Sequence, residues 1–198
     1  PSCWGQAIVA PSSTAPALTF ETSTVHPSGF STYEGTRMVR FNSWSCQDGA
    51  KIRLIPMALN TTANTSVDVD FKWFESINYP GDPNSIQIQY STDGTNWINA
   101  GSPISQYNVV QGWKHKTVTL PAGAAGQSLV FVGFLFQSDY GDDCYLDAVR
   151  IRETPTCYPP TNISATLTSS TSATLNWTAP TLGNTPANYE YTLSTSST

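Results

Sequence analysis

The sequence predicts an all-β protein, and composition, alternation and turn residues all favour this fold class. Only 12% of the 198 residues are charged, about half of the roughly 25% typical of soluble domains, whereas 12% are aromatic. Many short segments alternate between apolar and polar residues, as half-buried strands do, and no segment shows the period of an amphipathic helix. The 13 Gly and 14 Pro residues punctuate these segments. Coiled coils, helical bundles and disordered chains are thereby excluded.

At least eight strands are expected in the first 150 or so residues. In Val67–Phe74 the odd-numbered positions through Trp73 are apolar, and Asp68, Asp70 and Lys72 face the other way, which is typical of a strand buried on one side. Asp93-Gly94 lies between two such segments and predicts a hairpin turn, under which Trp97 packs. Without crossover helices, this many strands predict a β-sandwich. The expected strands include 38–41, 51–55, 67–74, 85–90, 113–120, 129–136 and 145–151.

A domain boundary is expected at the proline-containing stretch Glu153–Pro160, because proline cannot donate to a sheet and stiffens a linker. Alternating segments resume beyond it at 162–167, 173–177 and 189–193. We therefore expect two domains, residues 1–155 and 156–198.

Charge and hydropathy exclude two classes of partner. Lys and Arg together number 9 against 14 Asp and Glu, a net charge of -5, whereas nucleic-acid binding depends on clustered cations. The longest apolar run, 129–136, is far shorter than the roughly 18 residues of a membrane helix, so no membrane insertion is expected. The first residues lack a basic and then apolar signal sequence, and we expect that any export signal has been removed.

Four cysteines, Cys3, Cys46, Cys144 and Cys157, allow three disulfide pairings and form no C-x-x-C motif. An even number in a Thr-rich chain of low charge favours disulfides and an oxidising compartment. The pairing we favour is Cys3 with Cys157, at the two ends of one domain, and Cys46 with Cys144, between two loops. Buried free thiols are the alternative.

Several blocks match, in order, a bacterial family of jelly-roll domains. They are Glu34–Ser43, Val69–Trp73, Gln87–Trp97, Gly112–His115, Val118–Leu120, Gly133-Phe134, Tyr140-Gly141 and Leu146–Val149. With them, residues 27–153 resemble the domains related to the MAM and cleaved-adhesin families, which occur in large secreted and surface-anchored bacterial proteins. The resemblance implies a jelly-roll β-sandwich in the first domain.

Residues 157–198 resemble the first half of a fibronectin type III domain, an immunoglobulin-like sandwich, with Trp177 as its core tryptophan. Such sandwiches have about 90–100 residues. The resemblance therefore implies a partial domain and a piece of a longer modular protein.

A structural calcium ion is the one cofactor expected, because members of the resembled families often hold a cation near the closing strands. Calcium takes six to eight oxygen ligands. The candidate carboxylates are Asp142, Asp143 and Asp147, with Glu21 and Asp48 elsewhere, and Asp147 is the leading candidate. The alternative is that these acids only solvate a loop.

Aromatic side chains in loops are the candidate binding residues. Tyr79, Phe30 and Tyr33 lie in segments rich in Gly, Pro and Ser, and Trp44 could join them. Such rings can stack on a sugar or anchor a protein partner. Alternatively, they fold over the ends of the sandwich and close its core.

Catalysis is not expected. The two histidines, His26 and His115, lie in no metal or nucleophile motif. Carboxylate pairs such as Glu75 with Asp70, or Glu21 with Glu34, could be imagined for glycoside hydrolysis, but the sequence does not place either pair in one cleft.

The function expected from the resemblance is a non-catalytic adhesive or accessory binding module of a secreted or cell-surface bacterial protein. Its partner would be a protein or a polysaccharide, at a cell surface or in the extracellular matrix. A carbohydrate-binding module appended to a hydrolase and a purely structural spacer are the alternatives, because jelly-roll folds host all three.

Overall fold

The computed structural model describes residues 4–156, 159–180 and 187–190. The chain divides into two compact units, residues 1–153 and 154–198. This division lies two residues before the boundary expected from the proline-containing stretch.

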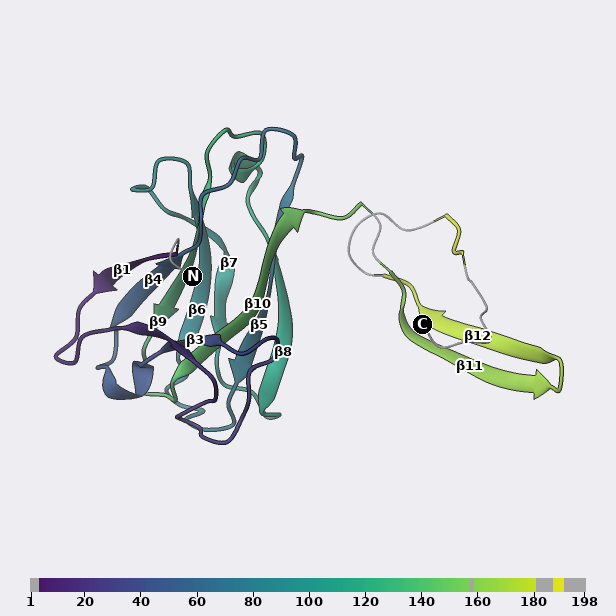
Figure 1. Cartoon of the computed structure of the whole chain (residues 1–198), viewed down its shortest axis with the longest axis horizontal. Helices are drawn as coiled ribbons and strands as arrows, with labels where there is room; N and C mark the ends of the chain where they lie inside the picture. Colours follow the sequence, from purple (N-terminus) through teal and green to yellow (C-terminus); the bar gives the residue numbers. More distant parts are fainter. Residues whose placement is uncertain (1–3, 157–158, 181–186, 191–198) are drawn as a thin grey trace. The chain divides into compact units, whose positions relative to one another are not determined.

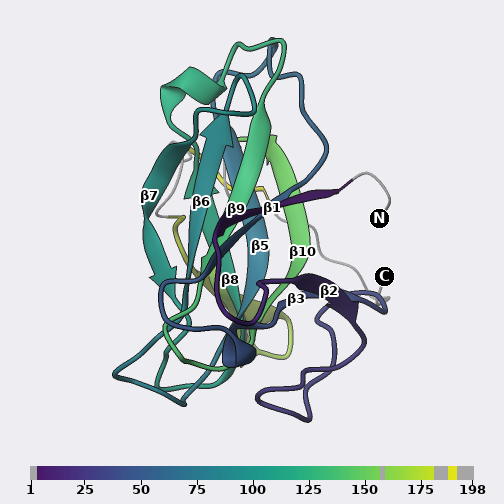
Figure 2. The ribbon, with the colours of Figure 1, turned by 90° about the vertical axis from the view of Figure 1, so that its left-hand side faces the viewer.

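The first unit is a jelly-roll β-sandwich of two antiparallel five-stranded sheets, seen from two directions in Figures 1 and 2. The first sheet has the order β1 (Gly5–Ala10), β4 (Lys51–Ile55), β9 (Phe131–Gln137), β6 (Ser85–Ser91) and β7 (Ile98–Ser105). The second has the order β2 (Leu18–Glu21), β3 (Met38–Phe41), β10 (Cys144–Glu153), β5 (Val67–Glu75) and β8 (Gly112–Thr119). Within β3 to β10, the chain crosses repeatedly from one sheet to the other, which is jelly-roll connectivity. The predicted fold class is confirmed.

The core lies between the two sheets and is rich in aromatic rings. Val67, Val69, Phe71 and Trp73 are each at most 3% exposed, which confirms the inner face predicted for this strand. Across the sandwich, the ring of Phe71 meets that of Phe134 edge to face, with centroids 5.7 Å apart. Full burial of each such side chain contributes about 1.5–3 kcal/mol, so this layer holds the two sheets together.

The polar face of β5 is less exposed than the alternation predicted. Asp68 is fully buried and Asp70 is 4% exposed. The Thr119 hydroxyl donates to the Asp68 carboxylate over 2.7 Å, and the Thr117 hydroxyl and Arg152 Nε donate to that of Asp70 over 2.6 and 2.7 Å. Neighbouring side chains of β8 and β10 therefore replace water around these two carboxylates.

The hairpin predicted at Asp93-Gly94 joins β6 to β7, and Gly94 has a φ of +75°. The Asp93 carboxylate accepts hydrogen bonds from the backbone N–H groups of Asn96 and Thr95, over 2.7 and 2.8 Å. These bonds, that to Asn96 foremost, hold the pKa of Asp93 far below its usual value. Trp97 lies against Gly133 of β9, where a Cβ would come within 2.6 Å of the indole ring.

The second unit contains an antiparallel pair, β11 (Thr161–Ser169) and β12 (Ser172–Thr178), which confirms the first two strands expected there. Tyr189 and Glu190 are not in a strand, and the rest of the third expected strand lies outside the described residues. Trp177 remains 43% exposed and packs edge to face on Tyr189, with ring centroids 5.2 Å apart. The fibronectin type III resemblance stays a prediction.

The predicted disulfide between Cys46 and Cys144 is wrong, because both are buried free thiols. Each sulfur has different neighbours: that of Cys46 lies 3.7 Å from the Thr14 carbonyl oxygen, and that of Cys144 lies 3.4 Å from the Ser43 hydroxyl. Burial raises the pKa of both thiols, so they remain protonated and act as small core side chains. Cys3 and Cys157 lie outside the described residues.

The described part of the chain contains two helices, the 3-10 turns Ser43–Ser45 and Ala122–Ala124. No helix in that part is long and apolar enough to cross a membrane.

Candidate binding site

A β-bulge in β10 decides which of its side chains reach the outer face of the second sheet. Asp147 pairs with Lys72 of β5 and Arg150 with Asp70, so one extra residue is accommodated between the two pairs. Ala148 in the bulge has a φ of +48°. In a regular strand residues three apart face opposite ways, but the bulge places Asp147 and Arg150 on the same outer face.

The bulge also anchors the β2–β3 loop, residues 22–37, to this face. The Asp147 carboxylate is buried and accepts three backbone hydrogen bonds: from Tyr33 over 2.8 Å, from Glu34 over 3.2 Å and from Ala148 over 2.6 Å. Hydrogen bonds to a charged acceptor contribute more than neutral ones. Asp147 therefore fixes both the bulge and the part of the loop that holds Tyr33 and Glu34.

Two further outer-face side chains hold the β2–β3 loop. The hydroxyl oxygen of Tyr145 accepts hydrogen bonds from the backbone N–H groups of Val25 and His26, over 2.6 and 3.0 Å. Burial raises the pKa of Tyr145 to about 12, so the phenol stays neutral. The indole N–H of Trp113 donates to the Ser31 carbonyl over 3.0 Å.

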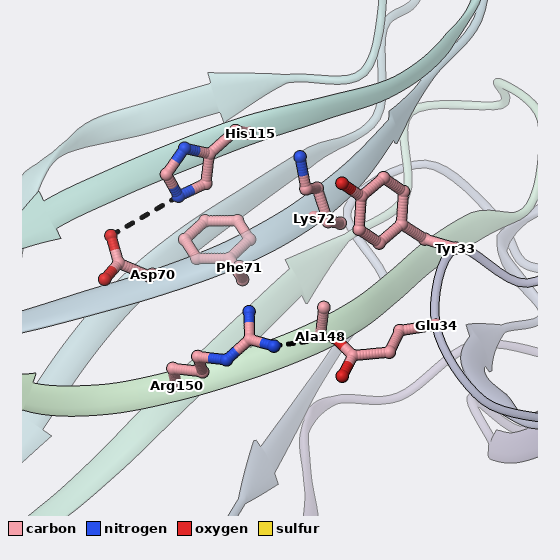
Figure 3. Close-up of a pocket in the computed structure, with 8 residues that line it drawn as sticks. All are labelled: Tyr33, Glu34, Asp70, Phe71, Lys72, His115, Ala148 and Arg150. Carbon is pink, nitrogen blue, oxygen red and sulfur yellow. Dashed lines mark hydrogen bonds and ion pairs between the residues drawn. The ribbon is translucent and has the colours of Figure 1, made fainter. Parts of the chain in front are cut away.

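Between this loop and the sheet lies an open pocket of about 470 Å³, which we call the sheet-face pocket. Figure 3 shows its lining, with Tyr33 and Glu34 entering from the loop and the other side chains from β5, β8 and β10. The lining residues are Tyr33, Glu34, Asp70, Phe71, Lys72, His115, Ala148 and Arg150.

Hydrogen-bonding and charged groups surround one aromatic ring in this pocket. Lys72 Nζ lies 4.1 Å from the centroid of the Tyr33 ring, a cation–π contact. His115 Nε2 lies 3.4 Å from the Asp70 carboxylate, and Arg150 donates to Glu34 over 2.8 Å (Figure 3). A flat ring beside several polar groups is the combination that binds a sugar, because a pyranose has apolar faces and hydroxyl edges.

The four aromatic residues predicted to bind a partner are divided among three places. Tyr33 lies in the sheet-face pocket, 49% exposed. Phe30 packs edge to face on the buried ring of Phe74, with centroids 4.9 Å apart. It therefore belongs to the small hydrophobic cluster of Phe74 and Tyr145 rather than to an exposed surface. Trp44 and Tyr79 lie together elsewhere, with centroids 5.7 Å apart.

Trp44, Tyr79 and His26 form a second group, which we call the loop-end aromatic cluster. His26 stacks on Trp44 with centroids 4.7 Å apart and planes within 12° of parallel. Trp44 is 46% exposed and Tyr79 37%, so both residues are partly open to solvent. His26 Nδ1 is buried and, among the described residues, has no hydrogen-bond partner.

Four of the acids predicted as calcium ligands, Asp142, Asp143, Asp147 and Glu21, have protein donors as partners. Arg40 Nε donates to Asp143 over 2.7 Å and Arg40 also lies 3.8 Å from Glu21, which links these two acids through one cation. Burial raises the pKa of Asp143, and this guanidinium opposes the rise. Asp142 accepts hydrogen bonds from Ser76 and Asn78.

Asp147 has different partners from these acids, because its carboxylate accepts three backbone hydrogen bonds. Within residues 4–156, 159–180 and 187–190, no three His, Cys, Asp or Glu side chains are grouped so as to hold a metal ion. Calcium binding by the predicted set therefore stays a prediction.

The carboxylates imagined in pairs for glycoside hydrolysis each form an ion pair with a protein cation. Asp70 and Glu75 lie five residues apart on β5, whose pairing with β8 is regular, so they face opposite sides of the sheet. Glu75 is buried and forms an ion pair with Lys116. Glu21 lies beside Arg40, and Glu34 is bound to Arg150.

The comparisons with known proteins support the fold alone. No protein-family model and no curated protein match the sequence. Among solved structures, the K2 cleaved adhesin domain of Lys-gingipain is similar with a TM-score of 0.54 and 15% identity, covering 77% of this chain and 89% of that one. The K1 cleaved adhesin domain of Lys-gingipain from Porphyromonas gingivalis has a TM-score of 0.51 and 17% identity, covering 78% and 93%.

A structure of carbohydrate-binding modules from the β-sandwich superfamily is also similar. Its TM-score is 0.51 at 14% identity, and the match covers 76% of this chain and 57% of that one. The chain therefore has a sandwich fold that adhesin domains and carbohydrate-binding modules share.

We predict that Asp147→Ala lowers the free energy of unfolding of the first unit by about 2 kcal/mol, because three N–H groups lose a charged acceptor. Asp147→Asn keeps one acceptor oxygen and should lose less. Urea denaturation measures both, and hydrogen exchange at the Tyr33 and Glu34 amides should accelerate in Asp147→Ala. An unchanged exchange rate at these two amides would contradict the anchoring role.

Calcium binding stays a prediction from the family resemblance. It predicts that millimolar calcium raises the melting temperature above that measured in excess EDTA, because a ligand of the folded state stabilises it. Differential scanning calorimetry checks this, with magnesium as the control ion. Equal melting temperatures in calcium and EDTA would contradict it.

Proposed function

We propose that this protein is a non-catalytic binding module that holds a polysaccharide in the sheet-face pocket. The observation that supports this most is the lining of the pocket, where the half-exposed Tyr33 ring lies beside the side chains of Lys72, His115 and Arg150. The ring offers an apolar surface to a sugar face, and the polar groups can bond to its hydroxyls.

The shape of the pocket fits a chain better than a small molecule. The pocket is open and lies on the outer face of the sheet, with lining side chains from β5, β8 and β10. A polysaccharide can cross such a surface with its ends in solvent, whereas small ligands are bound mostly in enclosed clefts. Carbohydrate-binding modules and adhesin domains occur among the similar folds, so the fold is compatible with this function.

A role outside the cell, secreted or at the cell surface, belongs to the same proposal. Polysaccharides of cell walls and of the extracellular matrix are the ligands that such a module would meet. The low charged fraction of the chain, 12%, and its β-sandwich are consistent with that setting.

The loop-end aromatic cluster supports a second candidate function, adhesion to a protein. Trp44 and Tyr79 expose 46% and 37% of their surfaces. Tyr and Trp are enriched among the residues that contribute most to protein interfaces. Their separation from the sheet-face pocket allows the two candidates to be tested by different variants.

We predict that Tyr33→Ala weakens polysaccharide binding roughly tenfold, the effect of losing one aromatic contact of about 1.4 kcal/mol. The fold should be retained, because the bond from Tyr33 to Asp147 is made by the backbone N–H. Affinity electrophoresis against a panel of soluble neutral and acidic polysaccharides, followed by calorimetry, measures the change.

Trp44→Ala is the matched variant, since it removes an exposed ring from the other cluster. Under the proposal it leaves polysaccharide affinity unchanged. Binding lost in Trp44→Ala and kept in Tyr33→Ala would move the site to the loop end, and no binding to any polysaccharide of the panel would contradict the proposed function.

A further inference from the structure

Of the charged side chains that line the sheet-face pocket, Lys72 is the one that forms no ion pair within 4.0 Å. Asp70 is neutralised by Arg152, which donates to it over 2.7 Å, and Glu34 by Arg150, over 2.8 Å. Among the described residues, no carboxylate lies within 4.0 Å of Lys72 Nζ. Asp147 is opposite Lys72 in the strand register, but its carboxylate is bound by three backbone N–H groups and lies beyond 4.0 Å from the ammonium group, so Lys72 has no direct anionic partner.

The contact that Lys72 does make is a weak one for an ammonium group. Its Nζ lies 4.1 Å from the centroid of the Tyr33 ring. A cation–π contact at an exposed site is weak because water screens and solvates the cation. An ammonium group donates three hydrogen bonds and pairs more strongly with an anion, so Lys72 can bind an anionic group of a ligand seated on Tyr33.

Arg150 supplies a second cation at small cost. Its ion pair with Glu34 joins two side chains that are 61% and 55% exposed. Exposed ion pairs of this kind stabilise a protein little, because water screens both charges. A ligand anion can therefore replace Glu34 as the partner of Arg150 without a large loss.

We propose that the sheet-face pocket selects anionic saccharides, with the Lys72 ammonium group bound to a carboxylate or sulfate group of a sugar that lies against Tyr33. This inference rests on the proposed function and adds the chemical class of the ligand. Neutral polysaccharides meet the same ring and hydroxyl partners, but they leave the positive charge of Lys72 without a counterion.

Calorimetry with two pairs of polymers tests the inference. Polygalacturonate and its fully methyl-esterified form share a backbone and differ in charge, and dextran sulfate and dextran form the corresponding sulfate pair. The intact chain should bind polygalacturonate at least about tenfold more tightly than the ester at low salt. Its affinity should fall as the salt concentration rises, because the pair is exposed and screened.

Lys72→Met removes the charge and keeps most of the length of the side chain. We predict that it reduces affinity for the charged polymers roughly tenfold and leaves affinity for the neutral ones within about twofold. Lys72→Arg should keep most of the affinity for the charged polymers. Lys51→Met is the matched control, because Lys51 lies on β4 in the other sheet.

The polymer pairs separate the outcomes. Preference for polygalacturonate alone identifies a carboxylate, and preference for both charged polymers identifies charge as the feature recognised. Equal affinity for the charged and neutral members of each pair, in the wild type and in Lys72→Met, would overturn this inference and leave the proposed function standing. Binding to none of the four polymers, nor to the wider polysaccharide panel, would overturn both.

Discussion

The buried carboxylate of Asp147 is the interaction on which the outer face of the second sheet depends. Its two oxygens accept backbone hydrogen bonds from the bulge of β10 and from the β2–β3 loop. One side chain therefore stabilises both the β-bulge in β10 and the position of Tyr33 in the β2–β3 loop. Both are needed to line the sheet-face pocket, since Arg150 reaches it only through the bulge.

The sandwich beneath supplies the rigidity that this arrangement needs. The inner side chains of β5, such as Phe71 and Trp73, are fully buried against the first sheet. A site on the outward side chains of well-packed strands keeps its geometry better than one on loops alone. Lys72 and His115 are placed by that register, and only Tyr33 and Glu34 depend on a loop.

Alternation in the sequence predicts β3 to β6 and β8 to β10, the inner face of β5 and the hairpin at Asp93, because these depend on local period and turn chemistry, whereas β1 and β2 are not among the predicted segments. The pocket was not predictable in the same way. The alternation does place Lys72 on the polar face of its strand. The neighbours of that strand, β8 and β10, follow from the order of strands in the sheet, and the pattern of a single strand does not predict this order. The bulge at Ala148 breaks the period on which such a prediction depends.

Resemblance to a family predicts Asp147 as a metal ligand, and that role stays a prediction; in the structure the carboxylate accepts hydrogen bonds from three backbone N–H groups. The same carboxylate chemistry serves either role, and only the positions of the donors distinguish them. The even number of cysteines favours disulfides, but Cys46 and Cys144 lie in the core as separate thiols.

The most direct test is the mapping of a bound oligogalacturonate by amide chemical shifts in the isotope-labelled protein. We expect the largest changes at Tyr33, Lys72, His115 and Ala148, around the sheet-face pocket. Changes concentrated at Trp44 and Tyr79, with the pocket amides unmoved, would contradict it.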